Sequence, residues 1–289
     1  MVTKKGDIEM VKSVMVIGAG QMGSGIAQVC ANAGIPVWLL DETKPLAEAG
    51  YQKISKQLEK LMAKGKITAE AGETTLSLIT VSGDLAIGAN ADVVIEAVNE
   101  NVELKKKVFN ALDAVCHKDT ILASNTSTIS ITLLGGSTQR ADKVIGMHFF
   151  IPPPVMKLVE VIPGLKTSLE THQVIMELAT KLGKVPVNAK DYPGFTVNRI
   201  FVPMWNDAMY LVMEGNKPED VDTAMKLGGN LPMGPLELAD FAGLDTVLSV
   251  MNVLWEGYHD PKYKPCPLLV KMVEAGNLGR KTGKGYYKY

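Results

Sequence analysis

Apolar residues in the first half of the chain form short continuous runs separated by amphipathic segments. The run 11–17 is β-branched and apolar, as expected of a strand buried on both faces of a parallel sheet. A glycine-rich turn and a small-residue helical stretch follow, and 36–41 predicts a second strand. Residues 91–98 and 120–125 repeat the strand pattern around a helical segment at 102–115. This alternation predicts an α/β fold, a Rossmann-type doubly wound parallel sheet.

The pattern changes near residue 190. Before it, two β-rich runs at 143–150 and 156–162 are joined by a three-proline turn, and 184–187 predicts one more strand. After Pro193 the chain shows helical periods without a convincing strand. The predicted helices cover 196–214, 218–227, 235–241, 246–258 and 267–275. We therefore expect two domains, an α/β domain over 1–192 and a smaller all-α domain over 193–289.

Composition narrows the possible partners and the compartment. The 289 residues carry 30 Lys and Arg against 31 Asp and Glu, so the chain has no overall basic field that would attract nucleic acid. The 3 cysteines share no CxxC spacing, which argues against a disulfide framework or a structural metal site and favours a reducing, cytoplasmic compartment. Asp7 and Glu9 interrupt any export signal. The uncharged stretch 13–40 is broken by glycines and amides, so we expect no membrane span.

The uncharged stretch contains the first candidate site. Its turn reads Gly18, Ala19, Gly20, Gln21, Met22 and Gly23, a GxGxxG between a strand and a helix, and Asp41 ends the next strand. Such glycines let the backbone approach a pyrophosphate at a helix N-terminus, and the acid binds ribose hydroxyls. The arrangement predicts a dinucleotide site, with a plain glycine turn of a flavodoxin-like fold as the alternative. Because Asp41 would repel a 2′-phosphate, NAD is favoured over NADP.

His148 is the second candidate, because it lies in a β-rich run while the other histidines occupy polar surroundings. Glu160 lies in the next run, and a hairpin-like reversal at the prolines would bring the two side chains together. An imidazole with a carboxylate partner can take a proton from an alcohol. On these residues alone a structural core histidine remains the alternative.

Five ordered blocks carry a resemblance to a known family. They are ASNTSTISI (123–131), GMHFFIPPPVMKLVEVI (146–162), PGFTVNRI (193–200), AMKLGGNLPMGPLELADFAGLDT (224–246) and GRKTGKGYY (279–287). In one register from Ser13 to Tyr289, the sequence resembles the L-3-hydroxyacyl-CoA dehydrogenases, in particular the short bacterial 3-hydroxybutyryl-CoA type.

The resemblance implies roles for particular residues. His148 corresponds to the general base and Glu160 to its partner. Ser127 corresponds to the serine that hydrogen-bonds the substrate oxygen beside the nicotinamide, and Asn198 to an asparagine that positions the reacting end of the substrate. Taken alone, Ser127 would be a turn or cap hydroxyl, and Asn198 a helix-surface amide.

The resemblance also implies further cofactor contacts. Glu100, Lys105 and Lys284 match family positions near NAD, although by themselves Glu100 and Lys105 would form an ordinary solvated pair. The chain departs from the family at Ile151, where an asparagine is usual. If that amide helps to hold the nicotinamide ribose, its loss would weaken cofactor affinity by about 0.5–1.5 kcal/mol.

A row of lysines could bind the phosphates of coenzyme A. Lys53, Lys56, Lys60 and Lys64 recur on one helix face, and Lys66 follows. A solvated lysine face is the alternative, but the resemblance places acyl-CoA recognition on this helix, with Lys60 and Lys64 as our first choices.

Together these features predict an NAD-dependent enzyme that interconverts (S)-3-hydroxyacyl-CoA, of four carbons, and 3-oxoacyl-CoA. A gulonate-type sugar-acid dehydrogenase and a non-catalytic NAD-binding protein are the alternatives. The methionine-rich helices and the family predict a homodimer. No metal site is expected.

Overall fold

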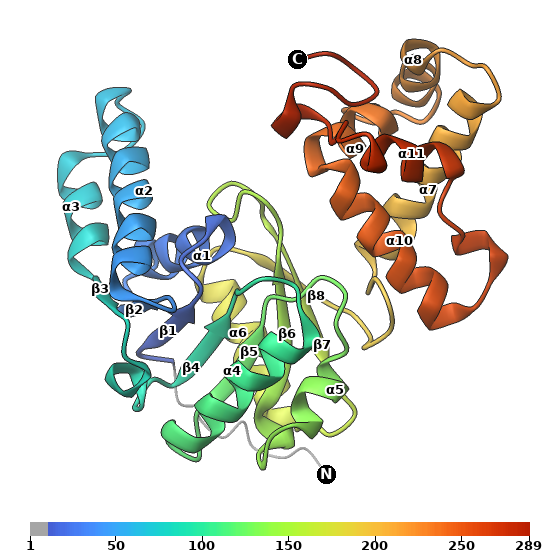
Figure 1. Ribbon diagram of the computed structural model, residues 1–289. Coiled ribbons are helices and arrows are strands. Elements are labelled where there is room, and N and C mark those ends of the chain that lie inside the picture. Colours follow the sequence, from blue (N-terminus) through green and yellow to red (C-terminus); the bar gives the residue numbers. More distant parts are fainter. Residues whose placement is uncertain (1–10) are drawn as a thin grey trace, which may run out of the picture. The chain divides into compact units, whose positions relative to one another are not determined.

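The computed structural model describes residues 11–289, which form two compact units, one ending at Asp191 and one running from Tyr192 to Tyr289 (Figure 1). Each unit is described by itself. The expectation that residues 1–10 carry no export signal lies outside the described residues.

The first unit is built on one eight-stranded sheet. Its strands are β1 (Val14–Ile17), β2 (Val37–Leu40), β3 (Ile79–Ser82), β4 (Val93–Glu96), β5 (Ile121–Ser124), β6 (Val144–Phe149), β7 (Leu158–Pro163) and β8 (Val185–Asn188). Their order is β3-β2-β1-β4-β5-β6-β7-β8. Neighbours from β3 to β6 are parallel, whereas β7 runs antiparallel to β6 and parallel to β8. The predicted Rossmann-type sheet is confirmed, and its strand order reverses between β1 and β4, where such folds bind ligands.

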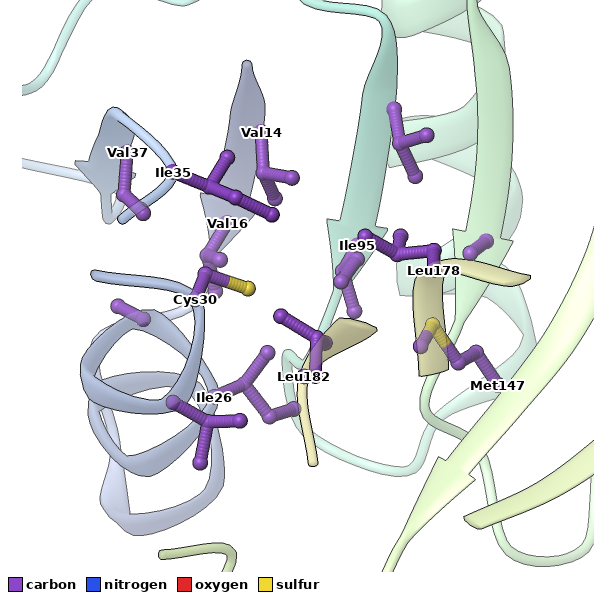
Figure 2. Packing of buried hydrophobic residues seen from close by; sticks show 14 of the residues in the cluster. Val14, Val16, Ile26, Cys30, Ile35, Val37, Ile95, Met147, Leu178 and Leu182 are labelled. Carbon is purple, nitrogen blue, oxygen red and sulfur yellow. The ribbon is translucent and has the colours of Figure 1, made fainter. Parts of the chain in front are cut away.

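Within residues 11–191, six α-helices accompany the sheet, and the core lies between them and the strands. They are α1 (Gln21–Asn32), α2 (Lys44–Ala63), α3 (Ala69–Ser77), α4 (Val102–Val115), α5 (Ile131–Gly136) and α6 (Leu169–Lys181). Figure 2 shows Ile26 and Cys30 of α1 and Leu178 of α6 in one cluster with Val14, Val16, Ile95 and Met147 of the strands. Helices α1 and α6 therefore pack on the same face, and the continuous apolar strands are buried as predicted.

The sequence pattern did not predict four of these elements, α3, β3, α5 and α6. Helix α3 is short and polar, and packs against α2 (Figure 1). Strand β3 is a four-residue edge strand with one buried residue. The N-cap residues of α3, α5 and α6 are Thr68, Ser130 and Ser168, and each side chain accepts a hydrogen bond from the backbone amide three residues further along the chain. These N-caps are the signal that could have located the helices.

The second unit is helical, as predicted. It contains α7 (Val197–Met213), α8 (Pro218–Gly228), α9 (Pro235–Ala242), α10 (Leu244–Tyr258) and α11 (Pro267–Glu274). Met209 and Met251 are fully buried in its core, whereas Leu211, Met213 and Leu227 are exposed. Among residues 11–289 no single helix is long and apolar enough to cross a membrane; α9 and α10, bent by 99°, meet that test only as a pair, by length and composition.

Candidate active site

The glycine turn after β1 has the shape that a dinucleotide requires. Gly18 has φ +95°, and a Cβ there would lie 2.6 Å from the Ala97 carbonyl oxygen. A Cβ on Gly23 would clash with the Gly18 carbonyl, so helix α1 packs closely against the turn. At Gly20, by contrast, a Cβ would meet nothing within 4 Å. No side chain of the described residues caps α1 at Gly20, so its first amide groups are available to a phosphate.

Asp41 is anchored against this turn. Its Oδ2 accepts a hydrogen bond from the Ala19 amide at 2.7 Å, and its Oδ1 accepts one from the Glu42 amide at 2.8 Å. Each carboxylate oxygen can accept a second hydrogen bond. The turn and the acid together fit the pyrophosphate and a ribose diol of NAD.

His148 and Glu160 lie directly opposite each other on antiparallel strands. They form a register pair between β6 and β7, and His148 Nδ1 lies 2.8 Å from Glu160 Oε2. The two residues are 6% and 1% exposed, so the contact between them is protected from solvent. The ring of Phe150 lies 4.6 Å from the imidazole, centroid to centroid. The expected reversal at the prolines is therefore present, and the carboxylate fixes the tautomer that leaves Nε2 as the proton acceptor.

Ser127 lies in the turn that follows β5, and this turn is organised by Glu100. Glu100 Oε1 accepts hydrogen bonds from the Ser127 amide at 2.9 Å, the Thr128 amide at 3.1 Å and the Thr128 hydroxyl at 3.0 Å. Partial burial works to raise the pKa of Glu100, but the charge of Lys105 and the hydrogen bonds from Thr126, Ser127 and Thr128 outweigh it and hold that pKa below its usual range. The segment after β4 thus positions the segment after β5.

The alternative interpretation of Glu100 and Lys105, as an ordinary solvated pair, is wrong. Lys105 is 1% exposed, and its Nζ lies 2.6 Å from Glu96 Oε1 and 3.3 Å from Glu100 Oε2. Glu96, which is fully buried at the end of β4, also accepts a hydrogen bond from the Ser124 hydroxyl at 2.7 Å. Sequence analysis missed Glu96 and Ser124, although polar residues at the carboxyl ends of two parallel strands are a usable signal.

The connection after His148 is held at its start by Asn125. Asn125 Oδ1 accepts a hydrogen bond from the Phe149 amide at 2.8 Å, which joins the end of β5 to the end of β6. Ile151 follows with a side chain that is 41% exposed. An apolar group at that position can cover a ligand but donates no hydrogen bond.

The lysine row lies on α2, as predicted. Ile54 and Leu58 are buried beneath the helix, whereas Lys53, Lys56, Lys60, Lys64 and Lys66 are exposed. Lys60 is in the last turn and Lys64 is the C-cap residue, positions where cations also stabilise the helix dipole. The exposure of these lysines is consistent both with binding the phosphates of coenzyme A and with a solvated helix face.

Two predicted residues belong to the helical unit. Asn198 is half-buried in the first turn of α7. Lys284 is exposed on a small loop in which the Gly279 amide donates to the Lys284 carbonyl at 2.8 Å. The glycine turn, Asp41, Glu100, Ser127 and His148 lie at the carboxyl ends of β1, β2, β4, β5 and β6 or shortly after them, which is one edge of the sheet. Glu160 reaches the same edge from the start of the antiparallel strand β7, and Lys105 lies on α4.

Comparison with known proteins agrees with this arrangement. The family description "3-hydroxyacyl-CoA dehydrogenase, NAD binding domain" matches residues 13–192, and "3-hydroxyacyl-CoA dehydrogenase, C-terminal domain" matches residues 194–289. The chain belongs to the 3-hydroxyacyl-CoA dehydrogenase family. NAD is therefore its cofactor, and the dinucleotide turn lies in the matched NAD-binding domain.

Relatives of this dehydrogenase chain are similar over nearly its whole length. A probable 3-hydroxybutyryl-CoA dehydrogenase of Bacillus subtilis is 53% identical, covering 96% of this chain and 98% of the relative. The human mitochondrial hydroxyacyl-coenzyme A dehydrogenase is 44% identical, covering 97% and 92%. The crystal structure of (S)-3-hydroxybutyryl-CoA dehydrogenase from Ralstonia eutropha has a TM-score of 0.94 at 47% identity, covering 96% of this chain and 99% of that one.

Proposed function

We propose that this 3-hydroxyacyl-CoA dehydrogenase interconverts (S)-3-hydroxybutyryl-CoA and acetoacetyl-CoA with NAD, using His148 as general acid and base. The observation that carries the proposal is the buried His148–Glu160 pair, 2.8 Å apart, at the sheet edge that also carries the dinucleotide turn. The relatives named as 3-hydroxybutyryl-CoA dehydrogenases support the four-carbon substrate.

The site residues have different roles in the two directions of the reaction. In oxidation, His148 Nε2 takes the proton of the 3-hydroxyl group, and the Glu160 carboxylate stabilises the resulting imidazolium through Nδ1. When bound, NAD supplies the hydride acceptor. In reduction, the imidazolium returns its proton to the substrate oxygen. Ser127, held in place by Glu100, hydrogen-bonds that oxygen, and Asn198 binds the reacting end of the substrate.

Cofactor and coenzyme A are assigned to separate elements. The glycine turn and Asp41 bind the adenosine and pyrophosphate part of NAD, while Glu100, Lys105 and Lys284 act near its nicotinamide half. Because Lys105 is 1% exposed and paired with two carboxylates, its part is to order the segment around Glu100. Lys60 and Lys64, exposed on α2, bind the phosphates of coenzyme A.

An absorbance assay of NADH separates this function from the two alternatives. Acetoacetyl-CoA should drive NADH oxidation, whereas gulonate with NAD should produce no NADH. The reverse pattern would identify a sugar-acid dehydrogenase. Activity with neither substrate would leave a protein that only binds NAD.

We also propose that the protein is a homodimer in a reducing cytoplasm. The three cysteines are buried and unpaired, which suits that compartment. In the helical unit a hollow of about 380 Å³ is lined mainly by apolar residues of α7 and α8, including Met204, Leu211 and Met225, and a second copy would cover such a surface. Sedimentation at micromolar concentration should give a species of twice the chain mass, and a species of single mass would contradict the dimer.

A further inference from the structure

Lys184, directly before β8, is a buried lysine that the catalytic scheme does not use. It is 9% exposed, and its Nζ donates hydrogen bonds to the Pro153 carbonyl at 2.6 Å and to the Met156 carbonyl at 2.9 Å. Both carbonyls belong to the β6–β7 connection, residues 150–157. No carboxylate of residues 11–289 lies within ion-pair distance of this ammonium group. Within residues 11–289, the hydrogen bonds of this ammonium group therefore go to the β6–β7 connection.

Burial and the neighbouring Cys30 determine the electrostatics of Lys184 within the described part of the chain. Burial lowers the pKa of the Lys184 ammonium group. The neighbouring Cys30 thiol has a pKa raised to about 12, because its burial outweighs the charge of Lys184, so Cys30 stays neutral. A buried ammonium group is costly unless its hydrogens find acceptors, and here the acceptors are backbone carbonyls.

The same connection is fixed on its other side by helix α1. A Cβ on Gly25 would lie 2.8 Å from Pro153 Cδ, so the proline ring rests directly on the helix. Gly25 is two residues beyond the last glycine of the dinucleotide turn. At the end of the connection, the Val185 amide donates to the Lys157 carbonyl at 2.8 Å.

This connection closes the strand pair that carries the proposed acid–base residues. The last two register pairs before it are His148 with Glu160 and Phe149 with Val159. If the connection loosened, these pairs would be the first to separate. We propose that Lys184 is a positioning residue: by holding the β6–β7 connection on α1, it keeps His148 and Glu160 in register. The inference rests on the function proposed above for that pair.

The kinetic test compares two substitutions at Lys184 with a matched control. Lys184→Met removes the ammonium group but keeps a long side chain. Lys184→Arg keeps the positive charge and has enough N–H donors for both carbonyls. Arg140→Met is the control, because Arg140 bonds Asp113 and the carbonyls of Cys116 and His117 in the same unit and does not contact the connection.

For Lys184→Met we expect kcat with acetoacetyl-CoA to fall by about tenfold or more, with KM changed by less than about threefold, since misplaced catalytic groups lower kcat. Lys184→Arg should return kcat to within about threefold of wild type, and Arg140→Met should lower Tm while leaving kcat unchanged. If Lys184→Met does not fold, Lys184→Gln, which removes the charge and shortens the reach but keeps an amide NH₂ group, serves in its place with the same expectation.

A spectroscopic measurement makes the result independent of turnover. The proton shared by His148 Nδ1 and Glu160 should give a downfield ¹H NMR resonance that is absent from His148→Gln. Lys184→Met should broaden or shift this resonance, and Arg140→Met should retain it. An unchanged resonance together with an unchanged kcat in Lys184→Met would overturn the inference. If the wild-type protein does not turn over acetoacetyl-CoA, the proposed function fails, while the resonance still decides the role of Lys184.

Discussion

Replacing Glu160 by glutamine isolates the contribution of the carboxylate to catalysis. The substitution keeps the size of a side chain that is 1% exposed but removes its charge opposite His148 Nδ1, 2.8 Å away. A hydrogen bond to a charged group is worth about 1.5–3 kcal/mol. Because about 1.4 kcal/mol corresponds to a factor of ten in rate, kcat should fall by roughly 10- to 150-fold.

The assay is the steady-state rate of NADH oxidation with acetoacetyl-CoA. KM for the thioester should change by less than about threefold, because Glu160 interacts with the imidazolium and not with coenzyme A. Glu177→Gln, a similar change at an exposed position on α6, should behave as wild type. A Glu160→Gln enzyme whose kcat stayed within twofold of wild type would refute the assigned role of the carboxylate.

Three further substitutions test other parts of the site. Asp41→Ala should raise KM for NAD about tenfold and narrow the preference for NAD over NADP, measured with both cofactors, since a carboxylate repels a 2′-phosphate. Lys64→Ala should raise KM for acetoacetyl-CoA more than it lowers kcat, and an unchanged KM would remove Lys64 from the site. Glu100→Gln should reduce the fall in Tm that the wild type shows as the pH decreases through the acid range. Although burial opposes it, contacts with Lys105 and residues 126–128 hold the pKa of Glu100 below its usual range. The wild type therefore loses this stabilisation as the pH falls below about 4.3, the ordinary glutamate pKa, which Tm measured against pH would show.

The structure was most predictable where a sequence motif coincides with a hydrophobic pattern typical of a strand or helix. The strand, glycine turn and helix at 14–32 were predictable because the turn needs glycine at close approaches, as at Gly18 and Gly23. The His148–Glu160 pair was also predictable, since a short proline turn between two β-rich runs allows few registers.

Other features could not be predicted from local pattern. Strand β3 is short and lies at the sheet edge, so its hydrophobic signal is weak. The burial of Lys105 depends on Glu96, nine residues away and on a different element, and its local helical context is that of a solvated residue. Lys184 likewise owes its burial to carbonyls about thirty residues away in the chain. Such partners become visible only when the strands are placed side by side.

The most direct test of the account compares the wild type with His148→Gln in the NADH assay with acetoacetyl-CoA. NADH oxidation by the wild type should depend on acetoacetyl-CoA. His148→Gln should lower kcat by about 10²–10⁴-fold, the usual contribution of a general acid or base. A wild-type protein without acetoacetyl-CoA-dependent oxidation, or a His148→Gln variant within tenfold of the wild-type rate, would contradict the proposed function.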